Sequence, residues 1–302
     1  MTGRFAMLGG FVLLLGAWWW SSRTPPEKEA PAPSKTMLGL AEDDVHSLRI
    51  QWQDKEPVVL RRNGTYWTLP NWNNYPADQT YANVLFRTLL TMPWGEVVSV
   101  PENKDAYGLS PAKRQVDLYN AQGSPVGSLL VGNPVGDYRT AFVRLPGSSR
   151  VRRVKADLIP SLSRISWARR SVWRLSESLI HSVTAAGFNN DFVVQREQEG
   201  GQWQLHGPVV QTLNDAFFTE LLPFLIHPKA GNVIFEPEAD FPVHASLRLK
   251  TSLTEMVLEL GDLDGEIIQV RYADEPVIYQ FSPRIRQLVA RAVTTEISGD
   301  GR

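Results

Sequence analysis

Short stretches with the residue pattern of β-strands begin at residue 48. In residues 48–52 apolar and polar side chains alternate, which is the period of a strand, and residues 58–62 form a second short β segment. Asn63-Gly64 follows directly, and this dipeptide is typical of tight hairpin turns. A third segment, residues 66–69, comes after the turn. The pattern predicts a β-meander at this point of the chain.

Two further segments repeat apolar residues at the spacing of a helix. After Thr80 these residues are Tyr81, Val84, Leu85, Leu89 and Met92, and after Thr212 they are Leu213, Ala216, Phe217, Leu221 and Phe224. Each threonine is a suitable N-cap, because its hydroxyl group can accept a hydrogen bond from a free backbone N–H of the first turn. We therefore predict one amphipathic helix after Thr80 and one after Thr212.

Alternating segments then return in two groups. The first group is 115–119, 128–131 and 140–145, and the second is 245–249, 256–260 and 267–272. The connections within each group are short, which favours antiparallel pairing. Short helical patterns follow at 155–162 and 284–293. The predicted fold class is α+β, with antiparallel sheets and a few helices.

The two groups belong to a tandem repeat. When the chain is laid over itself at an offset near 135 residues, matched landmarks occur in the same order. Trp67 matches Trp203 and Gly132 matches Gly261; residues 86–90 match 218–222, 130–133 match 259–262, and 142–144 match 269–271. The sequence therefore predicts two units of one fold, at residues 37–175 and 176–302.

The N-terminal segment has the composition of a membrane anchor. Residues 5–20 carry no charge, and Arg4 and Arg23 flank them. This length is slightly short of the about 20 residues that cross a bilayer, but flanking arginines extend the reach. Tryptophans favour the membrane–water boundary, so Trp18, Trp19 and Trp20 are predicted to anchor the helix at the interface. Because small residues are missing where a signal peptidase would cut, we expect an uncleaved signal anchor at 1–23.

This anchor predicts the location of the chain. Residues 24–36 are rich in Pro, Lys and Glu, which is typical of an extended linker. Positive charge around the anchor decides its orientation only weakly, and translocation of the long C-terminal part is the usual outcome. We therefore expect a single-pass inner-membrane protein with its C-terminal bulk in the periplasm.

Composition excludes several classes of function. The chain has 302 residues, a net charge of −1 and no cysteine. Binding to nucleic acid needs a clustered excess of Lys and Arg, so nucleic acid is not an expected partner. Without cysteine there is no disulfide, thiol nucleophile or cysteine-ligated metal. The phosphate-binding loop of an ATPase is also absent from the sequence.

No motif in the sequence predicts a catalytic, cofactor-binding or metal site. His46 and His181 occupy matched positions of the repeat, which favours a structural role at the start of a strand. Asp262 and Asp264 are spaced so that they could bind calcium, but they lie outside an EF-hand frame, and a solvated loop is the simpler interpretation.

Charge is distributed unevenly between the units. Residues 24–178 carry 20 basic and 15 acidic residues, which gives +5, whereas residues 179–302 carry 9 and 17, which gives −8. Eight basic residues fall between Arg150 and Arg174, opposed by one acidic residue, Asp157. This run is interpreted as a solvated face, as a surface that docks on the acidic unit, or as a contact with anionic lipid or a partner subunit. We predict that it lies at the junction of the units.

Five residues are candidates for a partner or membrane contact. Four come from the basic run: Arg152, Arg153, Arg169 and Arg170. The fifth is Trp72, which lies among polar turn-forming residues and has no counterpart in the second unit. An exposed aromatic side chain of this kind is typical of a binding surface.

Several of these segments resemble a known protein family. The segments 66–70, 97–102, 107–111, 130–133 and 142–144, together with Trp167–Trp173, resemble the bacterial DUF4340 family over roughly residues 37–295. The resemblance implies a membrane-anchored envelope protein, often encoded beside an ABC-type transport system similar to that of gliding motility. It therefore implies a non-catalytic accessory or scaffold protein, with the membrane subunits of the transporter as partners.

Two other classes of function remain open at this stage. One is an envelope hydrolase or glycan-processing enzyme with a site between the two units, which needs acidic and basic residues converging in a cleft. The other is a module that binds a lipid or small molecule at the groove between the units, which needs a large apolar pocket.

Overall fold

The computed structural model describes residues 35–99, 105–164, 166–197, 200–206, 211–235, 241–273 and 275–295. The predicted anchor at 1–23, with Trp18 to Trp20, lies outside these residues, as does nearly all of the predicted linker at 24–36. In the part of the chain that is described, no helix has the length and hydrophobicity needed to cross a membrane.

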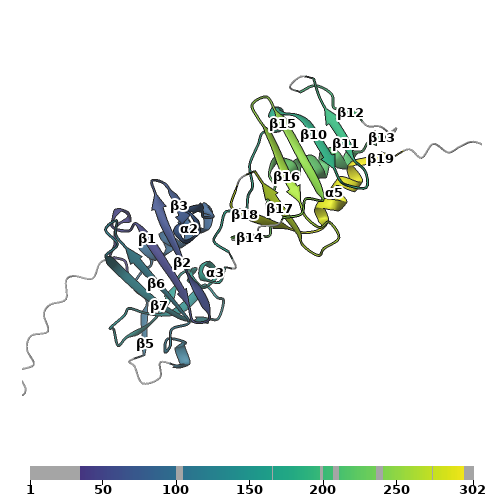
Figure 1. The fold of residues 1–302 in the computed structure, drawn as a ribbon. Helices are drawn as coiled ribbons and strands as arrows, with labels where there is room; N and C mark the ends of the chain where they lie inside the picture. The colour runs from purple at the N-terminus through teal and green to yellow at the C-terminus, as the bar shows by residue number, and fades with distance from the viewer. Residues whose placement is uncertain are drawn as a thin grey trace, which may run out of the picture.

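Two large antiparallel sheets form the framework of the fold (Figure 1). The first contains β1 (Ser47–Trp52), β2 (Lys55–Asn63), β3 (Tyr66–Leu69), β4 (Tyr75–Pro76), β5 (Glu96–Ser99), β6 (Arg114–Tyr119), β7 (Pro125–Val135), β8 (Thr140–Arg144) and β9 (Val151–Lys155). The second contains β10 (Ile180–Ala186), β11 (Phe192–Gln195), β12 (Gln204–His206), β14 (Asn232–Phe235), β15 (Ala245–Thr251), β16 (Glu255–Leu260), β17 (Ile268–Tyr272) and β18 (Val277–Phe281). β13 (Gln211–Leu213) pairs separately with β19 (Val293–Thr295).

Helices pack against each sheet. α2 (Gln79–Thr91) and α3 (Leu158–Leu162) accompany the first sheet, and α4 (Leu222–Ile226) and α5 (Arg284–Ala292) the second. A π-helical turn, η5 (Phe217–Leu221), leads into α4. Short 3₁₀ turns are η1 (Glu42–Asp44), η2 (Pro70–Trp72), η3 (Asp105–Tyr107) and η4 (Glu177–Leu179). This arrangement of antiparallel sheets with few helices agrees with the predicted α+β class.

The two sheets have the same strand order. The first runs β4-β3-β2-β1-β6-β7-β8-β9-β5, and the second runs β12-β11-β10-β15-β16-β17-β18-β14. Apart from the short edge strand β4, each strand of one sheet has a counterpart in the other at the same place in the order. This is the arrangement that two tandem units of one fold would give.

Strand register agrees with the landmarks of the repeat. Val131 of β7 pairs with Val143 of β8, and Leu260 of β16 pairs with Val270 of β17. The offset near 135 residues also matches Leu48 with Val183. Leu48 pairs with Leu118, and Val183 pairs with Leu249. Buried residues occupy all of these positions, so each sheet turns the same face to its core.

One interaction occurs in both units and was not predicted. Arg62 donates hydrogen bonds to the carbonyl oxygen and the carboxylate of Glu42, and its guanidinium lies 5.9 Å from the Trp67 ring centre. Arg196 donates to the carbonyl oxygens of Ile180 and Glu177, and its guanidinium lies 4.7 Å from the Trp203 ring centre.

The backbone around these arginines also repeats. The N–H groups of Arg62 and Arg196 donate to the carbonyl oxygens of His46 and His181, respectively. The two histidines therefore hold equivalent backbone positions at the starts of β1 and β10, as expected for a structural role.

Matched tryptophans hold the helices in place. Trp67 of β3 contacts Phe86 of α2 with ring centres 5.2 Å apart, and Trp203, just before β12, contacts Phe217 at 5.6 Å. The aromatic partner in the second unit is thus Phe217, not Phe218, which the sequence matched with Phe86. Phe218 is 42% exposed. The π-helical turn begins at Phe217, and its wider turn changes which side chains face inward.

Both predicted N-caps are wrong. Asp78, not Thr80, caps α2, and its carboxylate accepts a hydrogen bond from the backbone N–H of Tyr81. Asp and Thr are both good caps, so propensity alone does not distinguish them. Thr212 lies in β13, where it pairs with Thr294, and a strand residue cannot cap a helix. The helical segment begins after Asn214, whose carbonyl oxygen accepts a hydrogen bond from Phe217 N–H.

Candidate functional site

The two sheets are joined by a connection that pairs with both of them. Between α3 and β10, Ala168 forms a β-bridge with Ala77 beside β4, and Ser171 forms one with Lys229 beside β14. Trp167 and Val172 of this connection are buried. The segment that links the units therefore belongs to the packed structure.

A polar cluster crosses the junction between the sheets. The hydroxyl groups of Tyr75 in β4 and Tyr279 in β18 are 2.8 Å apart and share a hydrogen bond. Tyr75 Oη also lies 3.2 Å from the carbonyl oxygen of Arg169, to which it can donate. The Tyr279 hydroxyl and an Arg169 Nη each donate to the carboxylate of Glu275, the latter over 2.8 Å. These four residues, called the junction cluster below, connect the first sheet, the connection and the second sheet.

Burial and neighbouring charge perturb the junction cluster. Burial raises the pKa of Tyr279 well above its usual range, and the hydrogen bond to Glu275 raises it further. Burial also raises the pKa of Tyr75. Burial alone would lower the pKa of Arg169, but Tyr75, Tyr279 and Glu275 raise it above its ordinary value. Both tyrosines are therefore neutral and Arg169 is charged at physiological pH.

Aromatic packing lies next to the junction cluster. Trp72 of η2 stacks on Phe235 of β14, with ring centres 4.4 Å apart and planes 11° from parallel. Tyr75 meets the same phenyl ring edge-on at 5.3 Å. The expectation that Trp72 is an exposed aromatic is corrected, because its side chain is half-buried against the second unit. Trp72 therefore contributes to the contact between the two sheets.

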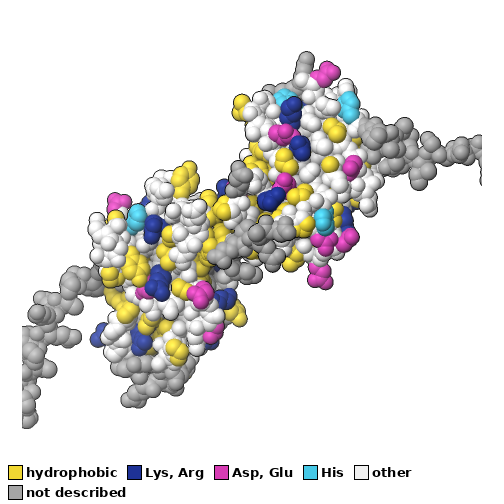
Figure 2. Space-filling model, viewed as in Figure 1, with side chains coloured by type: hydrophobic (Ala, Val, Ile, Leu, Met, Phe, Trp, Pro, Cys, Tyr) yellow, Lys and Arg dark blue, Asp and Glu magenta, His cyan; other side chains and the backbone are white. Residues whose placement is uncertain are grey.

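The basic run divides between two places. Arg152 and Arg153 lie on β9, which pairs with the edge strand β5. Arg152 donates to the carbonyl oxygen of Gly95 over 2.8 Å, and Arg153 forms an ion pair with Glu96. On the face shown in Figure 2, Lys and Arg side chains lie scattered among other residue types.

Two arginines of the run contact the second unit. Arg169 forms its ion pair with Glu275, and Arg170 donates to the carbonyl oxygen of Gly231 over 3.1 Å. Of the four candidate arginines, the structure therefore places these two at the junction, where the run was predicted to lie, and places Arg152 and Arg153 at the edge of the first sheet.

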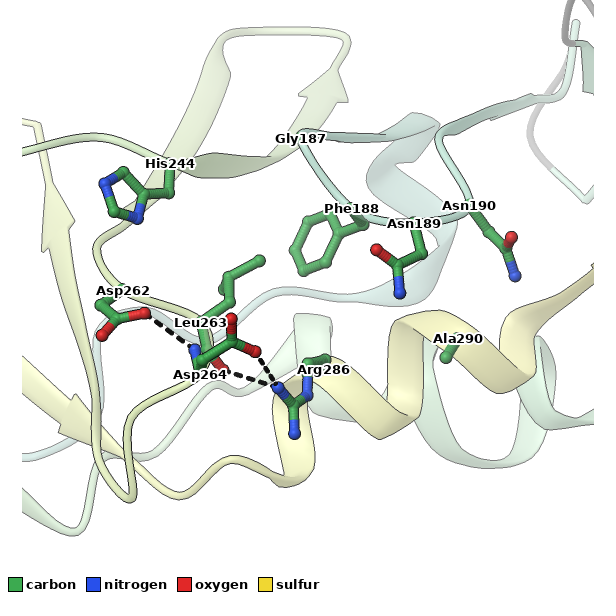
Figure 3. A pocket seen from close by; sticks show the side chains of 10 residues that line it. All are labelled: Gly187, Phe188, Asn189, Asn190, His244, Asp262, Leu263, Asp264, Arg286 and Ala290. Atoms are coloured by element: carbon green, nitrogen blue, oxygen red, sulfur yellow. Dashed lines mark hydrogen bonds and ion pairs between the residues drawn. The ribbon is translucent and has the colours of Figure 1, made fainter.

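A pocket of about 330 Å³ opens on the second unit (Figure 3). Its walls are the β10–β11 turn, His244 before β15, the β16–β17 loop and α5, and the residues are Gly187, Phe188, Asn189, Asn190, His244, Asp262, Leu263, Asp264, Arg286 and Ala290. Phe188 lies at the centre, with Leu263 on one side and Asn189 on the other. This space is called the outer pocket below.

The acidic residues of the outer pocket are partly engaged. Asp264 forms an ion pair with Arg286 at 2.7 Å, and its backbone N–H donates to Asp262 Oδ1 over 2.9 Å. Among the described residues, no three His, Cys, Asp or Glu side chains lie close enough to hold a metal ion. Asp262 and Asp264 are both solvent-exposed.

The first unit carries a similar hollow at the equivalent place. It measures about 320 Å³ and is lined by Trp52, Gln53, Asp54, Lys55, Lys113, Arg114, Leu162 and Ser163. These residues come from the β1–β2 turn, the start of β6 and the end of α3, which correspond to the elements around the outer pocket. The Trp52 Nε1–H group donates to the carbonyl oxygen of Leu162 over 2.7 Å, which closes this side of the hollow.

No sequence motif marks the junction residues Glu275 and Tyr279 or most residues of the outer pocket. Glu275 and Tyr279 lack a motif, because they meet their partners only through the docking of the two sheets. The outer pocket had a signal in the repeat, since the offset of 135 residues matches Trp52 with Gly187.

Comparison with known proteins gives one family match. A family model described as a domain of unknown function, DUF4340, matches residues 67–240. No curated protein and no solved structure matches the chain. The matched segment begins in β3 and includes the connection between the two sheets.

Proposed function

The chain belongs to the DUF4340 family, and from this premise we propose that it is a membrane-anchored periplasmic scaffold of an ABC-type envelope transport complex. In this proposal the N-terminal segment holds the chain in the inner membrane. The two α+β units, which we take to be tandem copies of one fold, form a rigid arm that binds the membrane subunits of the transporter. The chain itself carries out no chemical reaction.

The observation that carries this proposal is the construction of the junction. Three contacts cross it: the Tyr75–Tyr279 hydrogen bond and the Arg169–Glu275 ion pair, which belong to one network, and the stacking of Trp72 on Phe235. Hydrogen bonds and aromatic stacking both restrict the relative orientation of the two sheets. A fixed orientation is what a scaffold needs in order to hold partners at a set distance.

The same contacts make the junction a poor place for hydrolysis. Glu275 is the carboxylate of the junction cluster, and it already accepts hydrogen bonds from Tyr279 and Arg169. A general acid or base needs a free approach to the atom it protonates or deprotonates. This geometry favours a scaffold over an envelope hydrolase or glycan-processing enzyme with its site between the units.

A surface for the partner is offered by the edge of the first sheet. Trp94 lies just before β5 and Val97 lies in β5, and these residues are 38% and 42% exposed. Arg152 lies beside them, with its guanidinium 4.6 Å from the Trp94 ring centre. An aromatic and aliphatic surface with arginine at its side is typical of protein interfaces. We therefore assign the partner contact to Arg152 and Arg153, and the contact between units to Arg169 and Arg170.

Affinity purification of the full chain from detergent-solubilised membranes, followed by mass spectrometry, tests the proposal. ABC-type membrane subunits should co-purify with the wild-type chain. In a variant with Arg152 and Arg153 replaced by Ser, these subunits should no longer co-purify. The Tm should fall only slightly, because the exposed Arg153–Glu96 ion pair contributes about 0–1 kcal/mol and the hydrogen bond of Arg152 to the Gly95 carbonyl about 1 kcal/mol. The matched replacement of Arg169 and Arg170 should lower the Tm more. Absence of transporter subunits from the wild-type sample would refute the proposed function.

The distance between two spin labels, one in each unit, tests whether the arm is rigid. Because the chain has no cysteine, spin labels can be attached to Gln122→Cys and Leu253→Cys, which are exposed positions, one in each unit. Electron spin resonance should give one narrow distance between the labels. In a Trp72→Ala background the distribution should broaden. A broad distribution in the unaltered junction would contradict the rigid arm.

A further inference from the structure

The outer pocket and the hollow of the first unit occupy equivalent positions. Ile50 pairs with Val116 and Ala185 pairs with Leu247, so the matched strands place Gly187 where the first unit has Trp52. Val143 pairs with Arg152 and Val270 with Tyr279. When this alignment is continued along the chain, Ser163 matches Ala290, and each of the two residues lines the pocket of its own unit.

The exchange of tryptophan for glycine changes one wall of the pocket. In the first unit the half-buried indole of Trp52 packs against the core and is held by its hydrogen bond to Leu162. In the second unit Gly187 has a φ of +82°, and an added Cβ would lie 2.3 Å from the carbonyl oxygen of His244. No larger residue fits this backbone. One wall of the outer pocket is therefore formed by a position at which only glycine fits.

Several residues that line this space have polar side chains without a partner within the described ranges. The side chains of Asn189, Asn190 and His244 make no hydrogen bond to any residue in the described part of the chain. Together they offer amide and imidazole donors and acceptors, and the Asp262 carboxylate adds acceptors. Phe188 supplies an apolar ring at the centre (Figure 3).

Charge and volume restrict what this pocket can hold. Asp264 is neutralised by Arg286, while Asp262 has no basic partner among the described residues, so the pocket carries an excess of negative charge. An anionic ligand is disfavoured. A volume of about 330 Å³ is at the lower end of the range for ligand sites. A compact, uncharged molecule rich in hydroxyl groups, with one apolar face for Phe188, satisfies these conditions.

We propose that the outer pocket is a binding site for a neutral mono- or disaccharide. One face of a sugar ring lies on Phe188, and its hydroxyl groups exchange hydrogen bonds with Asn189 and with other polar groups of the pocket lining. The hollow of the first unit is of similar volume but has a different lining, with the Trp52 indole in place of glycine and with Lys55, Lys113 and Arg114 along its walls, so we expect it not to bind the same saccharide. This inference goes beyond the scaffold proposal and does not depend on it.

Ligand-observed NMR and calorimetry on the full chain test this inference. The protein is held in a zwitterionic detergent, because detergents with sugar headgroups would compete for the site. The probes are glucose, N-acetylglucosamine and the β-1,4-linked disaccharide of each, with glucuronate as the anionic comparison. We expect a Kd of about 1 mM for at least one neutral probe, typical of a small polar ligand, and weaker binding of glucuronate.

Matched substitutions in the two units locate the site. Ala290→Leu fills the outer pocket from an exposed helical position, and it is compatible with the helix because Ala and Leu are both strong helix formers. It should weaken binding by at least about tenfold, and Asn189→Ala should also weaken it. Ser163→Leu, the equivalent change in the first unit, should leave binding unchanged.

Three results would overturn the inference. These are no binding of any neutral probe at about 20 mM, unchanged binding by Ala290→Leu in a protein with unchanged Tm, or equal losses from Ala290→Leu and Ser163→Leu. Failure of transporter subunits to co-purify would count against the scaffold proposal alone. The two proposals can therefore fail separately.

Discussion

Stacking of Trp72 on Phe235 should contribute measurable coupling between the two units. An aromatic pair of this geometry, with ring centres 4.4 Å apart, contributes about 0.5–1.5 kcal/mol beyond the burial of its surface. We expect Trp72→Leu and Phe235→Leu each to lower the free energy of unfolding by about 1–2 kcal/mol. The double variant should lose about 1 kcal/mol less than the sum of the two, because the stacking can be lost only once.

Urea denaturation of the full chain, followed by far-ultraviolet circular dichroism, measures this coupling energy. Tyr107 and Phe142 give a matched control, because these half-buried rings meet at 4.7 Å within the first unit. Their coupling should persist whether or not the units dock. Additive effects at the junction, within about 0.3–0.5 kcal/mol, together with intact coupling in the control pair would refute the docked arrangement.

Three further predictions concern stability. The pKa of Tyr279 is raised above the usual 10.0, so the folded chain keeps this hydroxyl protonated at a pH where the unfolded chain loses the proton. The free energy of unfolding should therefore fall above about pH 10, by up to about 1.4 kcal/mol per pH unit. Urea titrations at several pH values should show this decrease, and it should be less steep in Tyr279→Phe. Arg196→Ala should lower the free energy of unfolding, measured by chemical denaturation, by about 3 kcal/mol, because Arg196 is 7% exposed. Arg62→Ala, at the equivalent and more exposed position, should lower it by about 1 kcal/mol. Equal losses in the two variants would contradict this reasoning. Gly132→Ala should lower the Tm, because its Cβ would lie 2.0 Å from the carbonyl oxygen of Tyr107, whereas Gly261→Ala, with 3.6 Å of space, should leave the Tm nearly unchanged.

Strands with one buried face were predictable from the sequence. In β15 the residues Ala245, Leu247, Leu249 and Thr251 are buried and those between them are more exposed, so the period of two is visible in the chain. β9 escaped prediction because its five residues include three cations, and its two buried valines, Val151 and Val154, do not alternate. β13 and β19 are polar three-residue strands that are defined by their pairing alone.

The interpretation of Trp72 shows why the site was harder to predict than the fold. An aromatic residue among turn-forming residues has the same sequence pattern whether it faces a partner protein or another part of its own chain. Its partner Phe235 lies in the other unit, so only the docking of the sheets identifies it. The absence of a counterpart in the second unit was nevertheless informative, because a residue that serves the contact between two copies has no reason to occur in both.

The same reasoning applies to Gly187, because the two sheets have the strand order expected of two tandem units. Positions that build the core agree in character between the units, as Leu48 and Val183 do. Positions that differ sharply are therefore the places to look for a task specific to one unit. Trp52 and Gly187 differ as much as two residues can in volume; Trp52 pairs with Arg114 at the end of β1, and Gly187 directly follows Ala186, the last paired residue of β10. Because the glycine cannot be replaced without displacing His244, the open pocket is built into the backbone of the second unit. The first unit has Trp52 at this position, so its hollow is lined by an indole ring instead.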